Sequence, residues 1–133
     1  MESFEHFRRA DTVLLTTRRR DGRTVDTPVN VAIDAEGRGY FRTDAASGKA
    51  KRLANFPGVR LAPCTRRGRP QGSDQPGVAT RVVGADADAA ARLLATRFPI
   101  IQGKLVPLTD RLRPREVAYY RLVPAEEPTP WTG

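Results

Sequence analysis

The stretch that most constrains the fold is YFRTDAASGKAKRL, residues 40–53. Its first part is rich in aromatic and β-branched residues, which is typical of a strand. Ser47 can then cap a helix, which we expect to run to about Asn55 because Pro57 cannot continue it. The stretch therefore predicts a strand that leads directly into a short capped helix.

Two further strands are expected before this stretch. A β-rich run over residues 12–17 is followed by the turn pair Asp21-Gly22 and by a second strand over 24–33. With the strand over 39–43, these segments predict a meander of three antiparallel strands. Pro28 lies inside the second strand, so that strand should have an edge or a bulge there.

The remaining elements follow from turn residues and from helical spacing of apolar residues. Ser3 can cap a first short helix with Phe4 and Phe7 on one face, and the prolines and Gly103 within 99–115 predict short helical turns joined by kinks. The other expected elements are a strand over 59–65, an exposed loop over 66–77, a strand over 78–83, a helix opened by Asp86 or Asp88, and a last strand over 116–123.

Six strands with short helices between them favour one antiparallel barrel of the mainly β (α+β) class. We expect one domain over residues 1–133, with a tail from about residue 124. The sequence contains no βαβ alternation, no G-x-G-x-x-G fingerprint and no P-loop. A nucleotide cofactor would therefore have to be held in another way.

Composition narrows the class of protein. Of 133 residues, 39% are hydrophobic and 29% charged, which is typical of a soluble globular chain, and no apolar run predicts a membrane span or signal peptide. We therefore expect a cytoplasmic protein. A lone cysteine, Cys64, and a lone histidine, His6, exclude the usual zinc clusters. The net charge of +8 favours an anionic partner, although the predominance of arginine over lysine also fits GC-rich coding.

Basic residues gather where the strand and the helix of residues 40–53 meet. Arg42 and Thr43 end the strand, and the free N–H groups of the helix start at Ser47 and Gly48 face the same region. Lys49, Lys51 and Arg52 follow in the first turn and a half, where the helix dipole disfavours cations. This pattern predicts an anion site; a solvated basic helix is the alternative.

The sequence resembles the split-barrel flavin and deazaflavin oxidoreductases, which are similar to pyridoxamine 5'-phosphate oxidase, and in particular their F420-dependent branch. The resemblance covers nearly the whole chain. It rests on the order and spacing of TVDTPV (24–29), FRT (41–43), SGKAKRL (47–53), PGVRL (57–61) and APCTRRG (62–68). It implies a six-stranded antiparallel split β-barrel of the FMN-binding type with short peripheral helices. It also implies a homodimer that transfers hydride between coenzyme F420 and a small organic acceptor.

The resemblance also implies which residues hold the cofactor. Lys49, with Lys51 and Arg52 beside it, would hold the phosphate and the acidic tail. The ring would lie along Thr27, Pro28 and Val29, with backbone groups of Pro63, Cys64 and Thr65 at its far edge. Ordinary barrel packing is the alternative for 27–29. Arg66, Arg67 and Arg69 form a second basic cluster that could extend the path of the tail or could simply be solvated.

Three other functions remain open at this point. FMN could replace the deazaflavin on the same barrel, although FMN carries a single phosphate and the basic residues spread beyond the reach of one. A non-catalytic carrier of the cofactor is the second alternative. Nucleic-acid binding is disfavoured because only Tyr40 and Phe41 place aromatic rings near the basic segment. Cys64 is expected to be a packing residue, because no histidine lies near it in the sequence.

Overall fold

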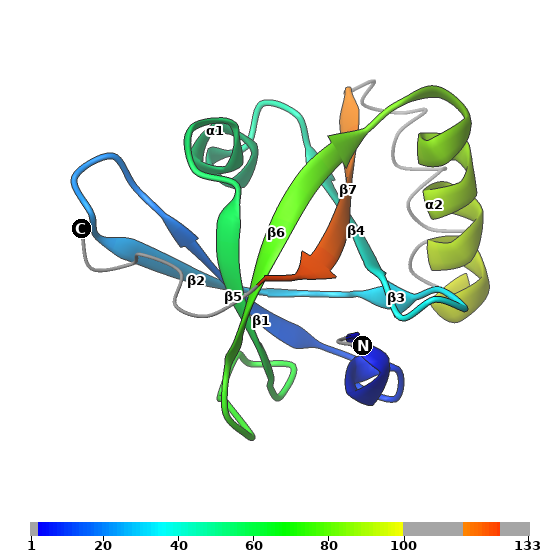
Figure 1. The fold of residues 1–133 in the computed structure, drawn as a ribbon, viewed down its shortest axis with the longest axis horizontal. Helices are drawn as coiled ribbons and strands as arrows, with labels where there is room; N and C mark the ends of the chain where they lie inside the picture. The colour runs from blue at the N-terminus through cyan, green and yellow to red at the C-terminus, as the bar shows by residue number, and fades with distance from the viewer. Residues whose placement is uncertain (1–2, 100–115, 126–133) are drawn as a thin grey trace.

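The computed structural model describes residues 3–99 and 116–125. Within them the chain forms one seven-stranded antiparallel sheet that curls into a half-barrel, with two α-helices against it (Figure 1). The elements are η1 (Glu5–Phe7, a 3-10 turn), β1 (Val13–Arg18), β2 (Thr24–Val29), β3 (Ala32–Ile33), β4 (Gly39–Asp44), α1 (Gly48–Asn55), β5 (Gly58–Pro63), β6 (Gln75–Val82), α2 (Gly84–Arg97) and β7 (Val117–Pro124).

The sheet closes on itself through one chain segment. Its strand order is β2-β1-β5-β6-β7-β4-β3, so its two outermost strands are separated in the sequence only by Asn30 and Val31. β2 pairs with β1 and β3 pairs with β4. The strand expected over 24–33 is therefore divided where the segment crosses from one end of the sheet to the other. This division gives seven strands where six were expected. The meander predicted that the second strand would pair with the strands before and after it, and β2 and β3 each form one of these two pairings.

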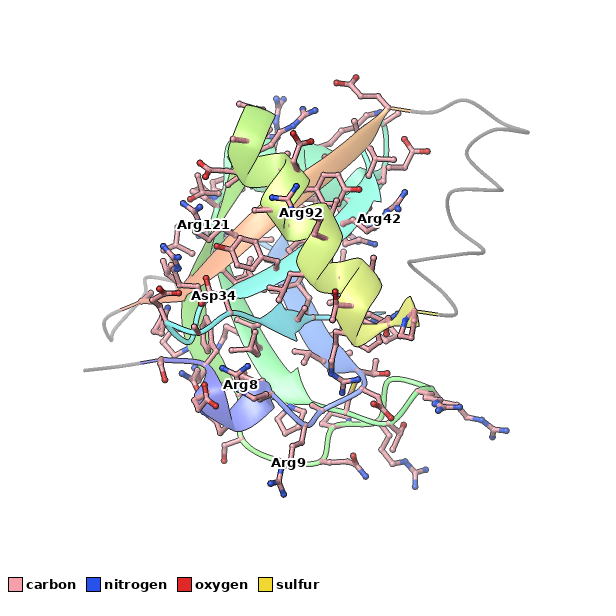
Figure 2. The ribbon with its side chains drawn as sticks, turned by 90° about the vertical axis from the view of Figure 1, so that its right-hand side faces the viewer. Arg8, Arg9, Asp34, Arg42, Arg92 and Arg121 are labelled. Atoms are coloured by element: carbon pink, nitrogen blue, oxygen red, sulfur yellow. The ribbon has the colours of Figure 1, made fainter. Side chains whose placement is uncertain are left out.

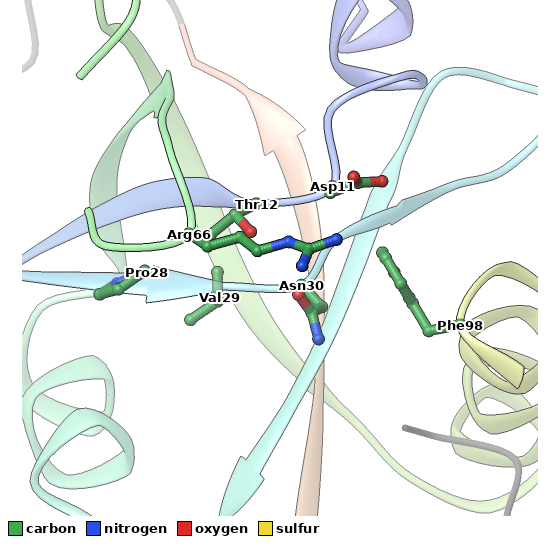
Figure 3. A pocket seen from close by; sticks show the side chains of 7 residues that line it. All are labelled: Asp11, Thr12, Pro28, Val29, Asn30, Arg66 and Phe98. Atoms are coloured by element: carbon green, nitrogen blue, oxygen red, sulfur yellow. The ribbon is translucent and has the colours of Figure 1, made fainter. Parts of the chain in front are cut away.

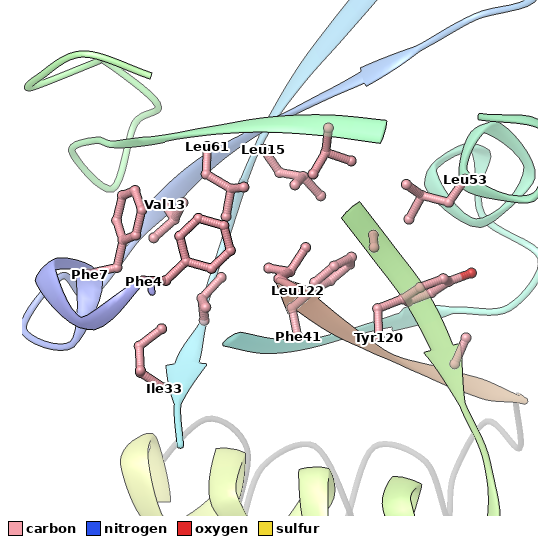
Figure 4. Close-up of a cluster of buried hydrophobic side chains, with 14 residues drawn as sticks. Phe4, Phe7, Val13, Leu15, Ile33, Phe41, Leu53, Leu61, Tyr120 and Leu122 are labelled. Carbon is pink, nitrogen blue, oxygen red and sulfur yellow. The ribbon is translucent and has the colours of Figure 1, made fainter. Parts of the chain in front are cut away.

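The core fills the inside of the barrel (Figure 4). Alternate residues of β1, Val13, Leu15 and Thr17, are all fully buried, as the period of a strand with one covered face requires. Phe41 of β4 stacks on Tyr120 of β7 with ring centroids 5.2 Å apart. Burial of each large side chain of this kind stabilises the fold by about 1.5–3 kcal/mol.

Short elements cover the openings and the outer face of the barrel. Phe4 and Phe7 of the η1 region are buried in the core, as their spacing predicted. Leu53 of α1 enters the same core, whereas α2 packs on the outer face of β4 and β7 through residues such as Leu94 and Ala90. The N-cap of α2 is Val83, so the prediction that Asp86 or Asp88 opens this helix was wrong; Asp86 lies in the first turn.

Several boundaries differ from the expected ones. β5 ends at Pro63 because Cys64 makes only an isolated bridge to Pro70, and β6 begins at Gln75, inside the expected loop. The expected kinked segment (beyond Pro99) and the end of the expected tail fall in 100–115 and 126–133, outside the described residues. In the part of the chain that is described, no helix is both long enough and apolar enough to cross a membrane.

Candidate functional site

The start of α1 is fixed by the end of β4. Ser47 has extended backbone angles, and its Oγ accepts a hydrogen bond from the Ala50 backbone N–H at 3.2 Å, so the expected cap is confirmed. The Thr43 Oγ1 lies 3.1 Å from the same Ser47 Oγ. The hydroxyl groups of Thr43 and Ser47 thereby hold the first turn of the helix, with its free N–H groups, against the end of a core strand.

Arg52 reaches back over this helix start. Its Nε donates a hydrogen bond of 2.6 Å to the Oγ1 of Thr17, a threonine with no exposed surface. A Cβ on Gly48 would lie 2.8 Å from a terminal guanidinium nitrogen of Arg52, so the guanidinium rests directly on the first residue of α1. Gly48 leaves the room for it, and Thr17 fixes its position.

Lys49 adds a second cation in the same turn. It is partly buried, and among the described residues its ammonium makes no hydrogen bond or ion pair. Burial lowers the pKa of Lys49, and the nearby charge of Arg52 lowers it further. Burial, and then the charge of Arg19, likewise lower the pKa of Arg52. The described first turn of α1 contains no acid. Lys49 therefore opposes the helix dipole, and the guanidinium of Arg52, a residue of the last turn, adds a like charge beside it.

A basic hollow of about 630 Å³ extends from this turn toward the β1–β2 hairpin. Arginines contributed by that hairpin face Lys51 and Arg52 of α1. The sequence interpretation did not single out the hairpin arginines, although three in succession just before the turn at Asp21-Gly22 were a visible signal. The hollow is lined by Arg18, Arg19, Arg20, Gly48, Lys51, Arg52, Ala54 and Asn55.

Arg42 is separated from this cluster. Alternation along β4 buries Phe41 in the core and sends Arg42 to the opposite face, where its guanidinium lies over the ring of Tyr119 at 5.8 Å. Figure 2, which faces α2, shows Arg42 beside that helix. The strand delivers Arg42 and Thr43 to one end of the barrel, but it brings only Thr43 to the start of α1.

Pro28 and Val29 line a different hollow, of about 440 Å³ (Figure 3). β2 is the only strand in the described part of the chain without a buried residue. Thr27 is partly exposed and pairs with Leu15 of β1. The rest of this hollow is formed by Asp11, Thr12, Asn30, Arg66 and Phe98.

The basic loop after β5 folds over this region. Gly68 has a φ of +87°, which favours glycine, and a Cβ there would lie 3.5 Å from the Cγ of Pro28. The Thr65 Oγ1 accepts a hydrogen bond of 3.1 Å from the backbone N–H of Arg69. This turn explains how Arg66 comes to line the same hollow as Pro28. Of the second basic cluster, Arg66 therefore lies beside the residues expected at the ring, whereas Arg67 and Arg69 line a hollow formed by the loop itself.

Residues 63–65 also lie close to this hollow. The backbone N–H of Cys64 donates to the Thr12 carbonyl at 3.3 Å, and Pro63 pairs with Val13. Cys64 is 7% exposed, and burial raises the pKa of its thiol, which disfavours a nucleophilic thiolate. Apart from Arg42, the expected site residues thus form two groups, one at α1 and one at Pro28, whose hollows share no lining residue.

Residues 3–99 and 116–125 contain no group of three or more His, Cys, Asp or Glu side chains that could hold a metal ion.

Comparison with solved structures defines the class of fold. The chain has the split β-barrel fold of the proteins that resemble pyridoxamine 5'-phosphate oxidase, as the sequence resemblance implied. No family model matches the sequence, and no curated protein matches it. The likeness is therefore one of structure.

Three individual structures illustrate the range of this fold. The heme storage protein HutZ from Vibrio cholerae superposes with a TM-score of 0.69 at 18% identity, over 92% of this chain and 87% of that one. An F420 reductase gives 0.66 at 19% identity, over 95% and 96% of the two chains. A putative pyridoxamine 5'-phosphate oxidase from Listeria innocua gives 0.57 at 13% identity, over 87% and 85%. The fold is thus shared by redox proteins and by a storage protein.

Proposed function

We propose that this protein is an oxidoreductase that uses the deazaflavin coenzyme F420 for hydride transfer to a small organic acceptor. The observation that carries the proposal is the pair of cations, Lys49 and Arg52, at the start of α1. Arg52 is held over Gly48 by the buried Thr17, and no acid of the described first turn compensates either charge. A phosphate bound there would accept hydrogen bonds from the helix N–H groups and from both cations.

The extent of the basic surface favours the deazaflavin over FMN. The hollow beside α1 joins Lys51 and Arg52 to the arginines of the β1–β2 hairpin. FMN carries a single phosphate, whereas F420 adds an acidic glutamate tail. A tail that leaves the start of α1 toward Arg19 would meet cations along the hollow, and its affinity would depend on salt.

The ring is proposed to lie along Thr27, Pro28 and Val29, with residues 63–65 at its edge. The partly exposed β2 supplies an apolar surface there, and the loop that carries Arg66 folds beside it. When bound, the coenzyme supplies the hydride. The residues of this chain bind it, orient it against the acceptor and exclude water, which hydride transfer requires more than it requires an acid or a base.

A homodimer is part of the proposal. The α1 group and the Pro28 group line separate hollows, and β2 remains partly uncovered in one copy of the chain. A second copy packed on this face would bury it and add a wall to the ring site. We expect sedimentation analysis at micromolar concentration to give the mass of a dimer. A monomer that still binds the cofactor would remove the interface from the proposal.

The decisive experiment is a fluorescence titration of the purified protein with F420 and, in parallel, with FMN. We expect saturable binding of F420 and weaker binding of FMN, with F420 the more sensitive to salt. Tighter binding of FMN would overturn the choice of cofactor. Turnover of bound reduced F420 with a panel of conjugated acceptors then separates an enzyme from a carrier, an alternative that the storage protein of the same fold keeps relevant.

A further inference from the structure

A third hollow lies where α1 faces a gap in the barrel wall. The last residue of β6 that pairs with β5 is Val78, and the Ala79 backbone N–H still donates to the Pro57 carbonyl at 2.9 Å. Beyond Ala79, β6 continues to Val82 paired with β7. The hollow of about 560 Å³ opens beside this stretch, and most of its wall consists of small or apolar side chains. These are Ala45, Ala50, Leu53, Ala54, Pro57, Val78 and Ala79.

Tyr120 brings a polar group to this apolar wall. The residue is 5% exposed and its ring is held by the stack on Phe41. Its hydroxyl makes no hydrogen bond to any residue in the described ranges, and Figure 4 shows the oxygen pointing out of the core cluster on the side of α1. The oxygen is not among the side-chain atoms that are fully buried without a hydrogen-bond partner, so it is accessible and open to a hydrogen-bond partner. A ligand in the hollow can provide this partner.

The charges around the hollow are positive. Lys51 lines it, and the described residues offer its ammonium no ion-pair partner. Arg81 lies directly opposite Tyr120 in the register of β6 and β7. Its guanidinium forms an ion pair with the carboxylate of Glu116, with a nitrogen–oxygen distance of 3.0 Å. No carboxylate is among the described residues that line the hollow. A charged occupant should therefore be an anion.

We propose that this hollow is a binding site for a medium-chain monocarboxylic acid. The alkyl chain would pack on the alanine-rich wall, and the carboxylate would accept a hydrogen bond from Tyr120 and face Lys51 and Arg81. The hollow shares Lys51 and Ala54 with the basic hollow proposed for the cofactor tail, but neither Lys49 nor any residue of the Pro28 hollow lines it. Binding of the acid is measured on the cofactor-free protein and binding of F420 is measured separately, so either proposal can fail without the other.

The experiment is calorimetric titration of the cofactor-free protein with octanoate, hexanoate and octanol. We expect saturable binding of octanoate. Hexanoate should bind roughly tenfold more weakly because two fewer methylene groups are buried, and octanol should bind at least tenfold more weakly because it lacks the charge. Equal binding of octanol and octanoate, or no saturable binding of octanoate, would overturn the proposal.

Two variants and a control place the ligand. Tyr120→Phe keeps the stacked ring and should weaken octanoate binding about tenfold or more, whereas Ala54→Phe, at an exposed position of α1, should fill the hollow and abolish binding. Tyr119→Phe, the adjacent tyrosine on the opposite face of β7, should bind as the wild type does. Thermal melts establish that all three variants fold. An equal loss in both tyrosine variants, or undiminished binding by Ala54→Phe, would refute the assigned location.

Discussion

α1 and α2 differ in how the charged residues of their first turns relate to the helix dipole. α2 places Asp86 in its first turn and Arg97 in its last, and each has a partner outside the helix: Arg121 at 3.7 Å and Asp11 at 3.1 Å. α1 places Lys49 in its first turn with no acid beside it. The charges of α2 therefore suit the helix dipole, whereas Lys49 of α1 opposes it. This difference supports the proposal that an anion from outside the chain binds at the start of α1.

The largest effect should come from Lys49→Ala. Loss of one charge-assisted contact to a phosphate should weaken F420 binding by roughly ten- to a hundredfold. The cofactor-free variant should be as stable as the wild type or slightly more so, because a cation leaves the positive end of a dipole. Fluorescence titration at two salt concentrations, together with thermal melts, measures both effects. Unchanged affinity would contradict the assignment, and a large loss of stability would mean that Lys49 has a structural role.

A smaller loss is expected when Arg52 keeps its charge but loses its anchor. Thr17→Val preserves shape and removes the hydroxyl that binds the Arg52 Nε, so the guanidinium is no longer held over Gly48. F420 binding should weaken by roughly threefold to tenfold. Thr16→Val is the matched control, because Thr16 bonds to Asp26 at 2.7 Å on the outer face of the same strand. Equal effects of the two variants would argue against a positioning role for Thr17.

Much of the fold could be predicted from local signals. The bounds of α1 follow from Ser47 and Pro57, and the burial of Phe4 and Phe7 follows from their spacing. The split of the second strand at Asn30 and Val31 could not be predicted. It depends on which strands its halves meet across the barrel, and those partners are distant in the sequence.

The site was predictable to a smaller degree. Sequence order brings Ser47 and Lys49 together, but the contact between Arg52 and Thr17 spans 35 positions and arises only when β1 packs against α1. The opposite orientations of Arg42 and Thr43 follow from strand alternation and were available from the sequence. The approach of Arg66 to Pro28 depends on the turn at Gly68, whose direction the sequence does not specify.

We expect a modest loss of stability when the first turn of α2 loses its acid. Asp86→Asn removes the acid from its first turn and should lower the free energy of unfolding by about 0.3–1 kcal/mol, with no change in F420 affinity. Urea unfolding and cofactor titration of the variant provide the two readings. The result should mirror that of Lys49→Ala, in which binding is lost and stability is kept. A loss of F420 affinity in Asp86→Asn would show that the two helices are coupled and would weaken the contrast between them.

The smallest expected effect is a pH dependence that belongs to Lys49. Burial and the charge of Arg52 lower its pKa in the folded, cofactor-free protein from the ordinary 10.5. Between the lowered value and the ordinary one, the unfolded chain binds more protons at this position than the folded chain does, so the free energy of unfolding rises with pH.

Other groups titrate in the same alkaline range, and for that reason the measurement is the difference between wild type and Lys49→Ala. We expect wild type to gain stability relative to the variant as the pH rises from neutral to about 10. The affinity of the wild type for F420 should fall over the same range, because the anion is held by the charged ammonium. A stability difference that stays constant or falls with pH would mean that the ammonium is already compensated in the free protein. That outcome would remove the reason why α1 needs an external anion.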